Sequence, residues 1–140
     1  MTEGWIKWEP IQDSTILYYM TNISYDTPGL TILLEQKNNS NKKISMLFDA
    51  HIASYFFTDL THRSNKSKYA QVLEMDQKFF TILHSNYLQR LSVQSGGISD
   101  TRDLIHFAIV ALDGIIDVAS PFEPIVCEFE DTIEMKGLYE

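Results

Sequence analysis

His106 and Asp117 are the residues whose types could perform acid–base chemistry together, because a histidine and an aspartate can form a proton-relay pair. They lie on the two arms of an apolar hairpin, residues 104–120, whose Asp113-Gly114 dipeptide is typical of a two-residue type I′ turn. In the register that this turn predicts, His106 faces Pro121, four residues beyond Asp117. At about 3.3 Å per residue, this offset separates the two Cα atoms by more than about 12 Å. The sequence therefore predicts no catalytic pair within the hairpin.

Asp117 still needs a partner for its charge. A carboxylate on a mostly apolar strand is costly unless a donor or a cation meets it. We expect Asp117 to accept from a backbone amide or from an arginine such as Arg102. A deep polar cleft between sheet and helix beside Asp117 or His106 would instead indicate an enzyme or a small-ligand-binding domain, which is the alternative.

The remaining side chains offer no catalytic or metal-binding pattern. The other histidines are dispersed without the spacing of a zinc site, and there is no Gly-x-Ser-x-Gly elbow. Cys127 has no His or Lys beside it to activate its thiol, so we expect a small buried hydrophobe within residues 125–129. Ser95-Gly96-Gly97 follows a helix instead of preceding one, so its amides form no phosphate cradle. We therefore expect no enzyme, no bound metal and no cofactor.

The elements that must position these residues are mostly strands. Both arms of the 104–120 hairpin are apolar on both faces, which places the hairpin at the centre of a sheet covered on both sides. Asp26-Thr27-Pro28-Gly29 has the composition of a tight turn, and residues 36–42 form a polar connection. Runs rich in β-branched and aromatic residues predict the other strands, the first three as a meander, over residues 16–25, 30–35, 43–48, 52–58, 78–83 and 125–129.

One helix is predicted over residues 86–94, where Ser85 is a good N-cap and the following glycines supply the end. Trp5 and Trp8 are expected to dock the N-terminus onto the body of the fold, as a helical turn or an irregular segment. An exposed aromatic anchor for a partner is the alternative for these two residues.

Together these patterns predict a single α+β domain over residues 1–140. We expect a mostly antiparallel β-sheet of about six or seven strands with one or two helices packed on it. The basic segment 59–68 is expected to form a loop, and residues 131–140 a frayed tail.

The net charge of −8 falls wholly within residues 100–140, since the acids and bases before them cancel. A one-signed surface repels nucleic acid and attracts basic proteins. The alternative is that these acids only solvate a sheet edge and protect it from pairing. Candidate partner-binding residues flank the hairpin, and they are Asp100, Asp103, Glu123, Glu128, Glu130, Asp131 and Glu134.

The expected compartment follows from the cysteine content and the hydropathy pattern. A single cysteine precludes an intrachain disulfide and suits a reducing cytosol. The N-terminus has no apolar core of signal-peptide length, and no run approaches the ~20 apolar residues of a membrane span. We therefore expect a cytoplasmic protein that binds neither membranes nor nucleic acid.

The stretch 104–124 combines an apolar Asp-Gly hairpin with Asp117-Val118 and two closing prolines. With a Trp-containing start, a β-meander and a capped short helix, it resembles a group of small bacterial immunity proteins encoded beside polymorphic or contact-dependent toxins. The resemblance implies a cytosolic inhibitor, monomeric or weakly dimeric, that binds a cognate toxin. Many such toxins are nucleases with basic active sites, which an acidic inhibitor would bind quickly and tightly. A dimerising adaptor that pairs through an exposed edge strand is a further alternative.

Overall fold

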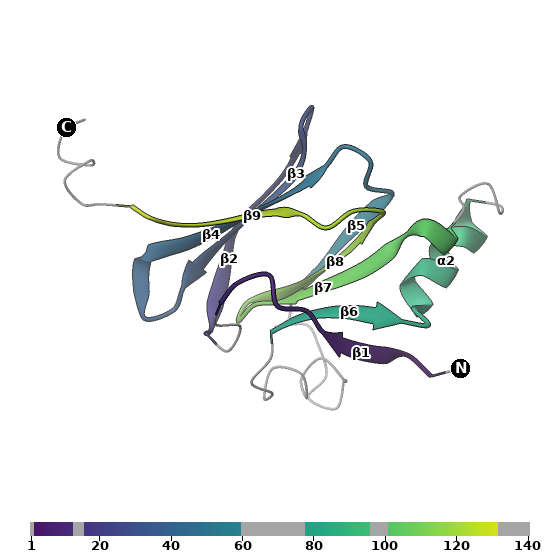
Figure 1. The fold of residues 1–140 in the computed structure, drawn as a ribbon, viewed down its shortest axis with the longest axis horizontal. Helices are drawn as coiled ribbons and strands as arrows, with labels where there is room; N and C mark the ends of the chain where they lie inside the picture. The colour runs from purple at the N-terminus through teal and green to yellow at the C-terminus, as the bar shows by residue number, and fades with distance from the viewer. Residues whose placement is uncertain (1, 13–15, 60–77, 96–100, 132–140) are drawn as a thin grey trace.

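The computed structural model describes residues 2–12, 16–59, 78–95 and 101–131, which form two antiparallel sheets and one α-helix (Figure 1). One sheet has the strand order β1-β6-β7-β8-β5, and the other has the order β2-β3-β4-β9. The expected α+β class with a dominant antiparallel sheet is confirmed. The elements are β1 (Gly4–Lys7), β2 (Tyr18–Asp26), β3 (Gly29–Gln36), β4 (Asn39–Asp49), β5 (Ser54–Asp59), β6 (Phe79–Leu83), α2 (Asn86–Gln94), a 3-10 turn (Thr101–Asp103), β7 (Ile105–Val110), β8 (Gly114–Ser120) and β9 (Ile125–Glu130).

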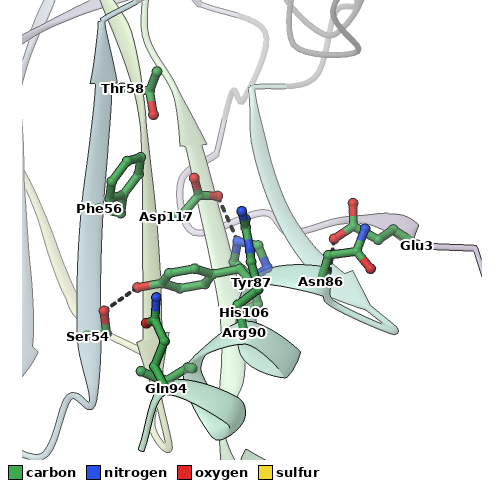
Figure 2. Close-up of a pocket in the computed structure, with 11 residues that line it drawn as sticks. Glu3, Ser54, Phe56, Thr58, Asn86, Tyr87, Arg90, Gln94, His106 and Asp117 are labelled. Atoms are coloured by element: carbon green, nitrogen blue, oxygen red, sulfur yellow. Dashed lines mark hydrogen bonds and ion pairs between the residues drawn. The ribbon is translucent and has the colours of Figure 1, made fainter.

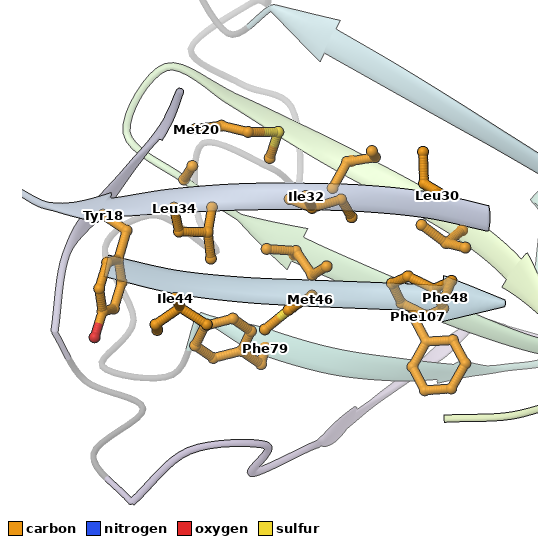
Figure 3. Close-up of a cluster of buried hydrophobic side chains, with 14 of the residues drawn as sticks. Tyr18, Met20, Leu30, Ile32, Leu34, Ile44, Met46, Phe48, Phe79 and Phe107 are labelled. Carbon is orange, nitrogen blue, oxygen red and sulfur yellow. The ribbon is translucent and has the colours of Figure 1, made fainter. Parts of the chain in front are cut away.

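The main core lies between the two sheets. Alternate residues of β3 and β4 point inward and are buried, as the period-two side-chain direction of a strand requires. Figure 3 shows them facing aromatic side chains of the other sheet, among them Phe79 and Phe107. Full burial of each large apolar side chain contributes roughly 1.5–3 kcal/mol, so this layer dominates the stability of the fold.

The β7–β8 hairpin is central and covered on both faces, as the sequence predicted. Its inward residues join the main core, and its outward residues join a second cluster that includes Phe80 and Val110. Trp5 packs edge-on against Phe80 with ring centroids 5.1 Å apart, while Trp8 is buried against Phe107. The N-terminus is therefore docked by its tryptophans, but Trp5 lies in a strand, β1, which was not predicted.

The predicted register of the hairpin is wrong by two residues. Ile109 faces Ile116, and the loop is formed by Leu112 and Asp113 instead of Asp113 and Gly114. Gly114 is the first residue of β8 instead of a loop residue. A glycine is needed there because any Cβ would overlap the ring of Phe57 and lie 2.8 Å from the carbonyl oxygen of Thr58. A shift of two residues leaves every side chain on its predicted face. The buried faces of the hairpin were therefore predicted correctly although its turn was not.

Asp113 holds the two sheets together at this loop. Its Oδ1 accepts a hydrogen bond of 2.9 Å from the backbone amide of Met20, which lies on the edge strand β2. The adjacent amide of Leu112 donates to the carbonyl of Tyr18 at 2.9 Å. The loop thereby satisfies backbone hydrogen-bonding groups on β2, the edge strand of the opposite sheet. The Asp-Gly turn preference, which is local, does not predict these contacts.

The helix and the meander agree with the sequence prediction, whereas the predicted connection between the second and third strands does not. The helix over Asn86–Gln94 and its Ser85 N-cap are confirmed, and the meander is formed by β2, β3 and β4. The polar connection at 36–42 is wrong in extent, since β3 runs to Gln36 and β4 begins at Asn39. The expected loop 59–68 lies outside the described residues apart from Asp59, and the expected tail is described only at Asp131. Within the described part of the chain, no helix has the length and apolar character needed to cross a membrane.

Candidate functional site

His106 and Asp117 form a buried hydrogen-bonded pair at the centre of the five-stranded sheet. Ala108 faces Asp117 across β7 and β8, so His106 is the diagonal neighbour of the carboxylate. The distance from His106 Nε2 to Asp117 Oδ1 is 2.7 Å, and the two residues are 2% and 5% exposed. The expectation that they lie too far apart is wrong because it depended on the wrong register. The partner of Asp117 is this imidazole, and not the expected backbone amide or Arg102.

Ser85 completes a three-residue hydrogen-bond chain. Its Oγ lies 2.7 Å from His106 Nδ1 and also accepts from the backbone amide of Leu88 at 3.0 Å, as an N-cap does. Because the carboxylate of Asp117 only accepts, His106 Nε2 donates to it. The Ser85 hydroxyl can donate to Nδ1 or accept from it. The imidazole is therefore held at both nitrogens.

The chemical order of this chain is that of a serine hydrolase relay, but the serine is not placed to act as a nucleophile. Ser85 is 8% exposed and does not line the adjacent pocket. One lone pair of its Oγ is committed to the first turn of α2. The preceding residue, His84, has a left-handed backbone with φ of 53°, which turns the chain sharply from β6 into the helix. The geometry is that of a cap that orients the imidazole of His106.

A pocket of about 560 Å³ lies over the pair, between β5 and α2 (Figure 2). His106 and Asp117 form its floor. Phe56 lines it from β5, and Tyr87 and Arg90 line it from α2. Sequence reasoning recognised the histidine and the aspartate, but it could not foresee that a strand 50 residues earlier in the chain and the capped helix enclose them.

Tyr87 fixes the helix over this floor. Its hydroxyl donates to Ser54 Oγ at 2.6 Å, and its ring lies 5.0 Å from the ring of His106. Burial raises the pKa of Tyr87, and the nearby charge of Asp117 raises it further, while the hydrogen bond with Ser54 and the charge of Arg90 act against these effects. The phenol is therefore a neutral donor that joins α2 to β5.

The β5 strand exposes three consecutive aromatic side chains. Tyr55, Phe56 and Phe57 are 40%, 59% and 39% exposed, and β5 is an edge strand of its sheet. Tyr25, near the end of β2, stacks on Tyr55 with ring centroids 6.0 Å apart. Side chains alternate along a strand, so Tyr55 and Phe57 face the side where β2 lies, and Phe56 faces the opposite side, toward the pocket. We call these four aromatic residues, which flank one strand edge on both sides, the β5 surface. Exposed aromatics at an edge strand are unusual for a surface with no partner, because such edges are normally short, charged or covered.

Carboxylates flank the β5 surface. Asp26 follows Tyr25 directly and is the last residue of β2. Asp59 is the last residue of β5. Both are exposed. The β5 surface thus lies between two exposed carboxylates. The sequence pattern of residues 52–58 predicted a strand but not this surface.

The acids predicted to bind a partner do not gather on one described surface. Asp103 lies in the 3-10 turn near α2, whereas Glu128 and Glu130 lie on β9, whose C-terminal end is at the opposite end of the molecule (Figure 1). Lys42 faces Glu130 across β4 and β9 and offsets its charge. Of the other acids, Glu123 is exposed between β8 and β9, Asp131 pairs with a lysine, and Asp100 and Glu134 lie outside the described residues.

The pair formed by Asp131 and Lys43 anchors the end of β9. The distance from Lys43 Nζ to Asp131 Oδ2 is 2.6 Å, and this hydrogen bond raises the pKa of Lys43. Cys127, on the same strand, is exposed, so its expected burial is wrong. Its neighbour Val126 packs on the core instead, because alternate residues of the strand face opposite sides.

The described residues contain no cluster of His, Cys, Asp and Glu side chains that could hold a metal ion. The chemistry available is therefore that of a polar pocket beside an aromatic, acidic strand edge. Comparison with family models, with curated proteins and with solved structures finds no match for this chain, so its function is argued from these two features.

Proposed function

We propose that this chain is an immunity-type inhibitor: it binds a basic protein toxin in the cytosol and neutralises it by occupying its surface. The observation that carries the proposal is the β5 surface, with Tyr55, Phe56 and Phe57 exposed on a strand that lies at the edge of its sheet among the described strands. Aromatic side chains supply most of the binding energy at the centres of protein interfaces. The flanking carboxylates and the net charge of −8 favour a basic partner.

The proposal moves the binding surface away from the C-terminal acids. Glu130 faces Lys42 of β4, Glu128 faces Ile44, and Asp103 is remote from both. The β5 surface has exposed aromatic area on both sides of a strand edge, with Asp26 directly after Tyr25. The C-terminal acids then contribute to long-range attraction and to the rate of association, which falls with ionic strength.

The test is co-expression with the product of the adjacent reading frame. We expect the chain to relieve that product's toxicity and to co-purify with it in a one-to-one complex. Phe56→Ser should abolish both effects, whereas the matched exposed change Phe129→Ser on β9 should leave both intact. The proposal is wrong if the adjacent product is neither toxic nor bound, or if the β9 variant loses protection while the β5 variant keeps it.

A second candidate function is a small-ligand-binding or enzymatic domain, which the polar pocket over His106 and Asp117 favours. The most specific version of this alternative is a hydrolase with Ser85 as the nucleophile, because Ser85, His106 and Asp117 are hydrogen-bonded in the order of a catalytic triad. A fluorophosphonate ester labels activated serines of this kind. Labelling of the wild type that is lost in Ser85→Ala would establish the hydrolase, and we expect no labelling because Ser85 is a buried cap.

A further inference from the structure

We propose that the pocket between β5 and α2 binds the guanidinium group of an arginine side chain supplied by the protein partner. The inference rests on the proposed function in one respect, namely that the partner is a basic protein. It goes further by naming the side chain, its site and the residue that receives its charge.

The first argument is position. Phe56 belongs to the β5 surface and also lines the pocket, so the pocket opens directly beside the region where the partner is proposed to sit. In Figure 2 Phe56 and Tyr87 approach from different elements, with Asp117 deeper in the sheet. A side chain that projects from a partner on β5 would therefore enter between two aromatic rings and reach the floor.

The second argument is charge. Asp117 is a nearly buried carboxylate whose Oδ1 accepts from the imidazole of His106. Its Oδ2 can accept a further donor. Glu3 also lines the pocket, with its carboxylate 2.8 Å from the amide of Asn86. A buried negative charge of this kind is stabilised by a cation.

Arg90 is the opposing charge in the pocket. It lines the pocket from the exposed face of α2, and no ion pair within the described residues joins it to Asp117. Its positive charge should weaken the binding of a cation, which gives the proposal a test of opposite sign from the removal of Asp117.

The third argument is shape and hydrogen bonding. The rings of Phe56 and Tyr87 offer faces on which a planar cation can stack, and arginine stacks in this way more readily than lysine. Thr58 also lines the pocket, and its Oγ1 is buried with no hydrogen-bond partner among the described residues. A guanidinium carries five donors, enough to serve both Asp117 and Thr58.

The experiment is an NMR titration of the full chain with N-acetyl-arginine N-methylamide, which carries the side chain without backbone charges. We expect saturable shifts at Phe56, Thr58 and Tyr87 with a dissociation constant of about 1–10 mM. The citrulline analogue, which has the same shape but no charge, should bind at least about tenfold more weakly. Equal binding of the citrulline analogue, or no saturable shift with the arginine probe, would overturn the proposal.

Free arginine separates a protein side chain from a small-molecule ligand. A side-chain site should bind free arginine no more tightly than the blocked probe. Tighter binding of the free amino acid by about tenfold or more would mean that the pocket recognises the α-amino and α-carboxylate groups, and this result would overturn the assignment to a partner's side chain.

Variants of opposite sign complete the test. Asp117→Asn should weaken the blocked arginine by about tenfold, and Arg90→Gln should strengthen it several-fold. Thr58→Val keeps nearly the same side-chain shape and removes the hydroxyl, so it should also weaken binding of the blocked arginine. This variant provides the test if Asp117→Asn does not fold. No change in Thr58→Val together with no gain in Arg90→Gln would count against the site.

The titration needs no partner, so its outcome is separable from that of the proposed function. Loss of arginine binding with an intact toxin complex would overturn the pocket assignment alone. Arginine binding in a chain that neither binds nor neutralises the adjacent product would overturn the proposed function and leave the guanidinium site.

Discussion

His106 Nε2 donates a hydrogen bond of 2.7 Å to Asp117 Oδ1 across the two central strands of the sheet. The bond buries a carboxylate at the floor of the pocket and satisfies one of its two oxygens. It also fixes the imidazole under α2, where Ser85 holds the other nitrogen. The pocket floor is therefore a hydrogen-bonded polar unit.

The stability of this unit can be measured by removing its acceptor. Asp117→Ala leaves the Nε2 hydrogen of a buried imidazole without a partner, which should cost about 1–3 kcal/mol in the free energy of unfolding by urea. Asp103→Ala, at an exposed acid, should change it by less than about 0.5 kcal/mol. A double-mutant cycle with His106→Ala should give a coupling of about 0.5–3 kcal/mol. Additive effects would show that the two side chains do not interact.

The Ser85 hydroxyl serves both the helix and the imidazole. Ser85→Ala removes the cap of α2 and the partner of His106 Nδ1, so we expect a loss of about 1–3 kcal/mol in unfolding free energy. The exposed control Ser40→Ala should be nearly neutral. Loss of α2 amide protection in hydrogen exchange should accompany the change. Unaltered exchange at Leu88 would contradict the capping role.

Tyr87 gives a pH dependence with a definite sign. Its pKa is raised in the folded chain, so the unfolded chain loses this proton first as the pH rises past about 10. The stability that depends on the protonated phenol is complete below that pH and is lost as the pH rises through the folded pKa. Tyr87→Phe should cost about 0.5–1.5 kcal/mol at pH 8 through the lost bond to Ser54. The difference from the wild type should shrink above pH 10, and a difference that grows there would be the contrary result.

The observed hairpin register makes a prediction at Gly114. Gly114→Ala places a Cβ into the ring of Phe57, so it should destabilise the chain by about 1–3 kcal/mol. Phe57→Ala should relieve much of this cost in the double variant, since it removes the obstructing ring. In the register that the Asp-Gly dipeptide suggests, Gly114 would lie in the loop and Phe57 would not matter. A cost independent of Phe57 would therefore favour that register.

The sequence predicted the strands other than β1, the helix and the buried faces of the hairpin because these depend on periodicity and capping, which are local. Ser85 was identified as a cap from its neighbours, and the two faces of the hairpin survived a wrong register because the error was even. The contact between His106 and Asp117 depended on the register itself. That register is set by Gly114 against Phe57 and by Asp113 against Met20, two contacts with strands distant in sequence.

The β5 surface could not be predicted for a related reason. Residues 52–58 were recognised as a strand, but whether Tyr55, Phe56 and Phe57 are buried depends on which strand lies beside them. Among the described strands β5 pairs with β8 alone, and the aromatic rings on its two faces are left exposed. Cys127 was mispredicted in the same way, because β9 is also an edge strand.

The measurement that tests the central claim most directly is the affinity of this chain for the product of the adjacent reading frame by titration calorimetry, for the wild type and for two surface variants. Phe56→Ser should weaken binding by about 2 kcal/mol or more, roughly thirtyfold, and the matched β9 variant Phe129→Ser should change it by less than about 0.5 kcal/mol. Wild-type binding should also weaken as salt rises. Full affinity in Phe56→Ser, with a large loss in Phe129→Ser, would contradict the assignment of the binding surface to β5.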